Sequence, residues 1–178
     1  DVSSIVSSAS VALEVQFVVA EAIALQSQEK YEEADALLNS INSPDSSVYS
    51  ALAENSRLTG DLNSAVQNNL DAINAKYWES GFDPGKDIVN LYNALAQNYN
   101  QLGEYSDMRG SLEDSLFYLD PVVDLSLYNS VQNQIGSSYL QENNYGDAES
   151  VFRAVLSRDN GNIDATLGLA QIDIQQNN

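Results

Sequence analysis

The sequence predicts an all-α fold in which pairs of antiparallel helices repeat along the chain. Hydrophobic residues make up 43% of the 178 residues, which is sufficient for a buried core. Only three prolines are present, the first at Pro44, so long stretches can be helical without interruption. A short motif recurs four times, and such repetition is typical of stacked helical hairpins.

The first expected helix contains the apolar run from Val11 to Leu25. Glu14, Gln16 and Glu21 interrupt this run, which is shorter than the roughly 20 apolar residues that span a bilayer. We therefore expect a packed helix here and no direct membrane insertion.

The remaining helices follow from apolar residues at helical spacing, separated by turn residues such as Pro44, Pro84-Gly85 and Asn160-Gly161. The expected helices cover residues 3–28, 31–41, 46–58, 62–78, 86–101, 105–118, 125–141, 146–157 and 163–176.

The recurring motif has a turn, an aromatic or apolar residue, and a small residue three positions later. Its four copies end at Ala34, Ala65, Met108 and Ala148, so the steps between them are 31, 43 and 40 residues. A second motif, an apolar residue followed by a small one, precedes three of the copies at Leu52-Ala53, Leu95-Ala96 and Ile135-Gly136.

These motifs resemble the tetratricopeptide repeat, which pairs two helices over about 34 residues. The best match consists of Ile135, Gly136, Tyr139, Tyr145, Ala148 and Phe152. The resemblance implies a right-handed superhelical solenoid with about four repeats and an extra C-terminal helix. We expect one domain, 1–178, with approximate repeats at 15–45, 46–88, 89–128 and 129–162 and a terminal helix at 163–176. The uneven steps, together with Met108 in place of the usual alanine, predict an irregular superhelix.

The charge limits the classes of partner. With 26 acidic and 7 basic residues, the formal net charge is −19, and no basic stripe is present. Nucleic acids and anionic lipids are therefore not expected as partners. The few lysines and many Asn, Gln and Ser residues favour an extracytoplasmic location, periplasmic or envelope-tethered, over a cytoplasmic one.

Catalysis, cofactors and metal sites are not expected. The chain has no cysteine or histidine, which removes disulfides, thiol chemistry, the usual zinc sites and histidine acid–base catalysis. The segment from Asp159 to Asp164 hints at a calcium loop. Its first and twelfth ligand positions would fall on Leu156 and Leu167, so we interpret the segment as a turn between repeats.

The resemblance also implies where a partner binds, because the first helix of each tetratricopeptide repeat lines the concave groove. Projected onto this chain, the groove is rich in neutral amides and hydroxyls and contains no lysine, which argues against a clamp for a C-terminal carboxylate. Amides can instead bind the backbone of an extended peptide, or they can simply form an uncharged surface. The candidate groove residues are Asn90, Asn93, Gln97, Asn100, Gln101, Asn133, Ser137, Gln141, Glu54 and Arg57.

Two further features have alternative interpretations. Tyr77, Trp78 and Phe82 either pack as a plug between repeats or form an exposed aromatic anchor. The first helix and the helix at 163–176 are more apolar than the polar caps that end a solenoid, so further repeats or self-association are expected at these ends.

Three hypotheses for the function follow. The leading one is a non-catalytic scaffold that binds a peptide or protein partner on the concave face. The alternatives are a structural protein that self-assembles through its apolar ends, and a module that binds a neutral ligand such as a glycan or a cell-envelope fragment.

Replacement of a small residue in the motif tests the predicted helix pairing. Two helices that approach to about 8–10 Å leave room only for a small side chain. We expect Ala65→Leu to overpack this contact and cost about 1–3 kcal/mol of unfolding free energy. A thermal melt measures the change, and an unchanged melting temperature would contradict the placement of Ala65.

Overall fold

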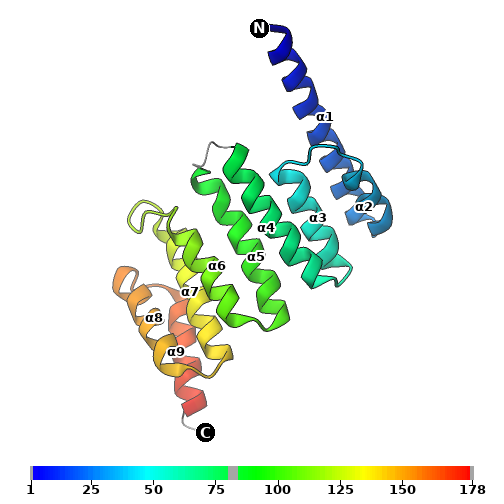
Figure 1. Ribbon diagram of the computed structural model, residues 1–178. Helices are drawn as coiled ribbons and strands as arrows, with labels where there is room; N and C mark the ends of the chain where they lie inside the picture. The colour runs from blue at the N-terminus through cyan, green and yellow to red at the C-terminus, as the bar shows by residue number, and fades with distance from the viewer. Residues whose placement is uncertain (1, 80–83, 177–178) are drawn as a thin grey trace. The chain divides into compact units, whose positions relative to one another are not determined.

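The computed structural model describes residues 2–79 and 84–176, and within these ranges it contains α-helices, one short 3-10 helix and turns, with no β-strand (Figure 1). The all-α fold and the pairing of successive helices are confirmed. The chain divides into two compact units, residues 1–84 and 85–178. The division falls in the segment expected to join the second and third repeats, while the repeat bounds themselves stay predictions.

The first unit contains two helix pairs. Helix α1 (Val2–Ser27) packs against α2 (Tyr31–Asn39), and α3 (Ser46–Leu58) packs against α4 (Leu62–Glu79). Helix α3 also contacts α1 and α2, so the two pairs stack. Their shared core consists of Ala22, Ala34, Leu38, Val48, Ala51 and Leu52.

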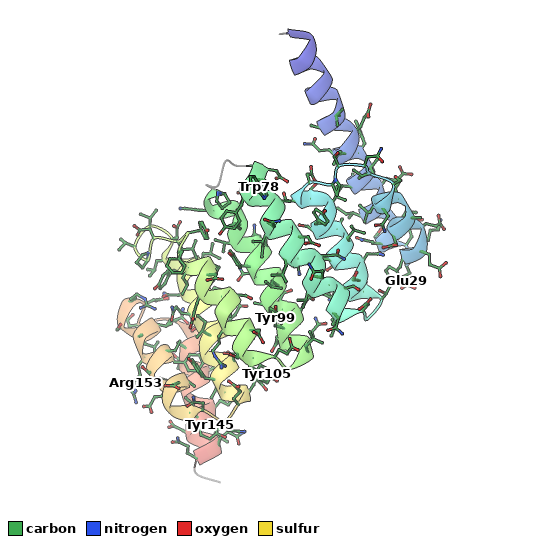
Figure 2. The ribbon with its side chains drawn as sticks, in the orientation of Figure 1. Glu29, Trp78, Tyr99, Tyr105, Tyr145 and Arg153 are labelled. Atoms are coloured by element: carbon green, nitrogen blue, oxygen red, sulfur yellow. The ribbon has the colours of Figure 1, made fainter. Side chains whose placement is uncertain are left out.

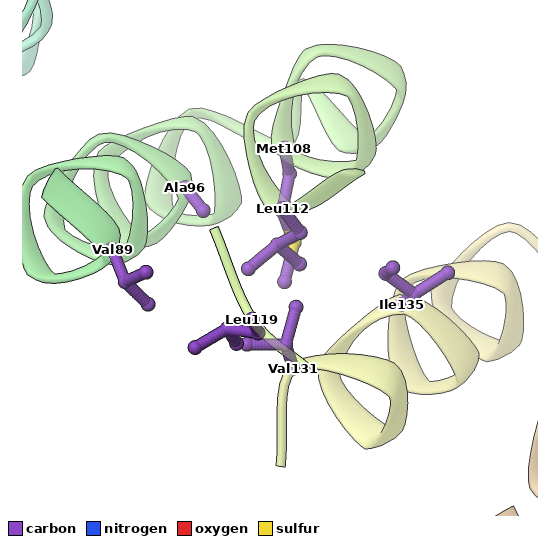
Figure 3. Close-up of a cluster of buried hydrophobic side chains, with 7 residues drawn as sticks. All are labelled: Val89, Ala96, Met108, Leu112, Leu119, Val131 and Ile135. Atoms are coloured by element: carbon purple, nitrogen blue, oxygen red, sulfur yellow. The ribbon is translucent and has the colours of Figure 1, made fainter. Parts of the chain in front are cut away.

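The second unit repeats this arrangement. A 3-10 turn, η1 (Gly85–Asp87), leads into α5 (Ile88–Leu102), which pairs with α6 (Tyr105–Leu116). Helix α7 (Leu125–Gln141) pairs with α8 (Tyr145–Arg158), and α9 (Ile163–Gln176) packs on both. Side chains from α5, α6, α7 and the segment between α6 and α7 meet in one core, shown in Figure 3: Val89, Ala96, Met108, Leu112, Leu119, Val131 and Ile135.

The helix bounds agree closely with the sequence prediction, with one correction at the start of α5. The helix predicted from residue 86 begins instead with the 3-10 turn Gly85–Asp87, and regular α-helix starts at Ile88. Gly85, the first residue of this turn, has a φ of 60°, which is left-handed and cannot be part of a regular α-helix.

The same turn joins the two helices of every pair. One residue adopts a left-handed conformation: Glu29 (φ 60°), Gly60 (85°), Gly103 (77°) or Asn143 (57°). The next residue donates its backbone N–H to the carbonyl five positions earlier, at 2.9–3.0 Å, in all four turns. This is the Schellman motif, which ends a helix and satisfies its last carbonyls. Figure 2 labels Glu29 in the first turn and Tyr105 and Tyr145, which follow the third and fourth.

Small residues flank each turn at constant offsets. The position seven residues before the left-handed residue is Ala22, Ala53, Ala96 or Gly136, and the position five residues after it is Ala34, Ala65, Met108 or Ala148. All eight are buried. A Cβ atom at Gly136 would lie 2.7 Å from Cε1 of Phe152, so the aromatic ring occupies the space that glycine leaves. The predicted burial of the motif is therefore confirmed.

Two glycines of the second unit make a matched test of the turn. Gly103 has a φ of 77°, whereas Gly110 lies within α6, and an added Cβ at either position meets no atom within 4 Å. We expect Gly103→Ala to destabilise by about 1–2 kcal/mol, because a left-handed conformation is strained for alanine. Gly110→Ala should stabilise by about 1 kcal/mol through helix propensity. Urea denaturation measures both, and changes of the same sign would contradict this account.

Candidate partner-binding surfaces

Two helices of the second unit present amide and hydroxyl groups at matching positions. Asn90 and Ser130 lie thirteen residues before the left-handed residue of their turns, and Gln97 and Ser137 lie six residues before it. All four are exposed, as are the predicted groove residues Asn100, Gln101 and Gln141. We call these exposed residues of α5 and α7, together with Asn93 and Asn133, the amide face.

Asn133 does not lie where the sequence placed it. It is 6% exposed, and its Nδ2 donates to Oδ1 of Asn162 at 2.9 Å. The Asn162 oxygen also accepts the backbone N–H of Ala165, so it caps the start of α9. The prediction of an exposed groove position is wrong here because α9 and its turn pack over this part of α7.

Two equivalent amide oxygens of the amide face have no hydrogen-bond partner in the structure. Asn93 and Asn133 each lie ten residues before a left-handed residue, and the Oδ1 atom of each is buried and unpaired. Buried polar atoms without partners are uncommon, since burial removes the water that would otherwise bind them. These two oxygens therefore single out one repeated position of the amide face.

The groove residues predicted in the first unit neutralise one another. Arg57 donates from Nε and Nη2 to the two carboxylate oxygens of Glu54, at 2.7 and 2.6 Å. The hydrogen bonds that Arg57 donates to Glu54 raise the pKa of Arg57, so its guanidinium is charged at neutral pH. Both side chains are half-exposed, and the bidentate pair occupies the strongest donors and acceptors of this part of α3.

A cluster around Arg109 of α6 was not predicted from the sequence. The Arg109 guanidinium forms an ion pair with Glu142, donates to Oγ of Ser138 at 3.3 Å, and lies 4.3 Å from the ring centroid of Tyr139. Its side chain is only 14% exposed. Because these partners lie 29 to 33 residues further along the chain, no local pattern identifies the cluster.

A second arginine ties the α7–α8 pair together. Arg158 donates from Nε to Oδ1 of Asn129 at 3.2 Å and lies 5.1 Å from the Tyr128 ring centroid.

Lys86 of η1 pairs with Asp124 ahead of α7, and hydrogen bonds from Lys86 and from the backbone of Asp120 lower the pKa of Asp124. Most of the few cations are thus engaged within the protein.

The apolar residues at the two ends are exposed, as expected. Ile163, Leu167 and Ile174 of α9 are 61–72% exposed, and Leu13 and Phe17 of α1 are 53% and 68% exposed. Both helices therefore present apolar side chains to solvent in their own units.

Trp78 at the end of α4 is 66% exposed, and its role as a plug between repeats or as an aromatic anchor stays a prediction. It borders a cavity of about 350 Å³ with Pro44, Tyr49 and Asp71 (Figure 2 labels Trp78). Phe82 lies outside the described residues.

The segment from Asp159 to Asn162 forms a turn, as predicted, in which Asp159 accepts the backbone N–H of Gly161. Among the residues that the structure describes, no group of three acidic side chains is arranged to hold a metal ion. In the same residues, no helix has the length and apolar character needed to cross a membrane.

Comparison with known proteins supports the fold. A family model described as tetratricopeptide repeat matches residues 139–178. A tetratricopeptide repeat protein from Parabacteroides merdae is similar in structure, with a TM-score of 0.67 and 18% identity over 89% of this chain and 59% of that one. BtubC from P. vanneervenii has a TM-score of 0.63 and 16% identity over 91% and 70% of the two chains. No curated protein matches in sequence.

MamA from AMB-1 is a further structural relative. Its TM-score is 0.62 at 15% identity, over 93% of this chain and 84% of that one. At these identities the likeness extends to the fold alone. This chain spans 59% of the Parabacteroides merdae protein and 29% of the matched chain of the Cut9–Hcn1 complex.

Arg109 and Arg153 provide a matched test of the clusters. Arg153 of α8 is 68% exposed and pairs only with Glu149 one turn away, a contact worth about 0.3–0.5 kcal/mol. We expect Arg153→Ala to change the unfolding free energy by no more than this. Arg109→Ala should cost about 1–2 kcal/mol, because it removes a largely buried guanidinium and its packing on the Tyr139 ring. Equal effects in urea denaturation would contradict a clamping role for Arg109.

Proposed function

We propose that this protein is a non-catalytic scaffold that binds an extended segment of a protein partner on the amide face of α5 and α7. Proteins with the tetratricopeptide repeat fold generally serve as protein–protein interaction scaffolds and are typically not enzymes. The identity of the surface, and the extended form of its ligand, are the specific parts of the proposal.

The unpaired oxygen of Asn93 is the observation that carries the proposal, since Asn133 lies beneath α9 and its turn. A buried acceptor without a donor costs about 1–3 kcal/mol, and a backbone N–H of a bound peptide would remove that cost.

The exposed residues of the amide face support the same ligand. Asn90, Gln97 and Gln141 each offer both donors and acceptors, as a peptide backbone does. None of them carries a charge, so the amide face would select for backbone geometry more than for particular side chains.

Self-association is a second candidate function, favoured by the exposed Ile163, Leu167 and Ile174 of α9. Apolar side chains on one helix face can pack against a second copy. If the mass measured by light scattering stays that of a monomer over two decades of concentration, this candidate is excluded. Leu167→Glu should abolish any dimer that does form.

A peptide selection tests the main proposal. Peptides selected on the protein from a neutral random library should lose at least about tenfold in affinity when Asn90, Gln97 and Gln101 are all replaced by alanine. The matched control replaces the exposed amides Asn63, Asn160 and Gln171, which lie outside the amide face, and should bind as the parent does.

The selected peptides also distinguish backbone recognition from side-chain recognition. Methylation of their backbone nitrogens should weaken binding more than alanine replacement of their side chains, because the proposal assigns the contact to backbone N–H groups. Peptides that bind all variants equally would overturn the proposal. A glycan array run with the same variants tests the neutral-ligand alternative.

A further inference from the structure

We infer that a cavity in the first unit, between α2 and the α3–α4 turn, binds the guanidinium group of an arginine side chain from a partner protein. This goes beyond the proposed function, because the cavity lies in residues 1–84 and has a different chemistry from the amide face. We call it the acidic cavity.

The acidic cavity has a volume of about 480 Å³, within the range of about 300–1,000 Å³ that is usual for ligand pockets. Three carboxylates line it, Glu32 and Asp35 from α2 and Asp61 from the turn just before α4. No lysine or arginine is among the residues that line it, and amides and hydroxyls supply most of the remaining wall.

The nearby cations are engaged outside this wall. Lys30 lies 3.9 Å from Glu33, and Arg57 forms the bidentate pair with Glu54. The hydroxyl and the backbone N–H of Ser64 bind Asp61 and lower the pKa of its carboxyl, so Asp61 is charged at neutral pH. The cavity therefore has an uncompensated negative charge.

A buried amide provides an independent sign of a missing donor. Asn55 of α3 lines the cavity and is 4% exposed. Its Nδ2 donates to the backbone carbonyl of Tyr31 at 3.0 Å, which ties α3 to the start of α2. That contact accounts for the nitrogen, but the Oδ1 atom is buried without a partner. A ligand with several N–H donors could satisfy both this oxygen and the carboxylates.

The second unit shows what occupies the equivalent place there. Asn55 lies five positions before the left-handed Gly60, and Ser138 lies five positions before the left-handed Asn143, so the two residues are equivalent. On the helix before each of them, Asp35 lies six positions after the left-handed residue 29, and Arg109 lies six positions after the left-handed residue 103. Arg109 places its guanidinium beside Ser138 and Glu142, so a guanidinium fills this place in the second unit.

The two units are thus complementary in charge at one repeated position. Where the second unit supplies its own arginine, the first has Asp35 and an unpaired Asn55 oxygen. Guanidinium is favoured over ammonium because its five donors lie in a plane and can bind several acceptors at once, whereas ammonium is a compact and strongly hydrated charge.

Titration with Nα-acetyl-arginine amide, followed by the ¹H–¹⁵N NMR signals of the Asn55 side chain and the Ser64 backbone, tests the inference. We expect saturable shifts at these signals. Nα-acetyl-citrulline amide, which has the same shape without the charge, should bind at least about tenfold more weakly. The lysine amide should fall between the two. Equal binding of the arginine and citrulline amides, or shifts that do not saturate, would overturn the inference.

Variants at Asp35 separate a specific site from general attraction to an acidic protein. Asp35→Asn should weaken binding of the arginine amide about three- to tenfold, whereas Asp114→Asn, an equal charge change on the exposed surface of α6, should leave it within about twofold. Equal losses in both would show diffuse attraction only and overturn the inference.

Asp35→Arg gives the sharper result. If the cavity accepts a guanidinium, the new arginine should fill it from within, abolish binding of the arginine amide and raise the melting temperature. Asp114→Arg should do neither. A folded Asp35→Arg variant that still binds the arginine amide as the parent does would contradict the inference, and if this variant fails to fold, Asp35→Asn decides.

Discussion

Close approach of the two helices in each pair is the constraint on which the rest of the structure depends. A left-handed residue reverses the chain, and small residues at fixed offsets on either side let the helix backbones come together. Gly136 shows how tight the contact is, since the ring of Phe152 occupies the space a side chain would need. Met108 is the exception, and its flexible thioether side chain fills the core shared by α5, α6 and α7.

Because all four turns have the same geometry, residues at the same offset from a turn occupy equivalent positions in the repeat. Positions ten residues before the turn hold Asn93 and Asn133, and positions five residues before it hold Asn55 and Ser138. The fold thus presents the same site more than once, and the side chains decide what each copy does. In the second unit the Arg109 guanidinium fills this position, whereas in the first unit the carboxylate of Asp35 lines a cavity at the equivalent position.

Six of the cationic side chains are engaged within the protein. Lys30, Arg57, Lys86, Arg109 and Arg153 all form ion pairs, and Arg158 binds Asn129. The surface that remains is acidic and rich in amides, which disfavours polyanionic partners. It suits two kinds of ligand group: backbone N–H donors on the amide face, and a cationic side chain at the acidic cavity.

The sequence by itself determined the all-α class, the helix bounds within a few residues and the buried motif residues such as Ala65 and Ala148, because apolar periodicity and small-residue spacing are local signals. It did not identify Glu29 and Asn143 as left-handed, since neither is the glycine that usually marks such a turn. It also placed Asn133 on an exposed face. Only the tertiary structure decided these points, together with the Arg109 cluster and the unpaired oxygens of Asn55, Asn93 and Asn133. The burial of Asn133 and the Arg109 cluster depend on which helix packs over the residue, and the partner is up to 33 residues away in the chain.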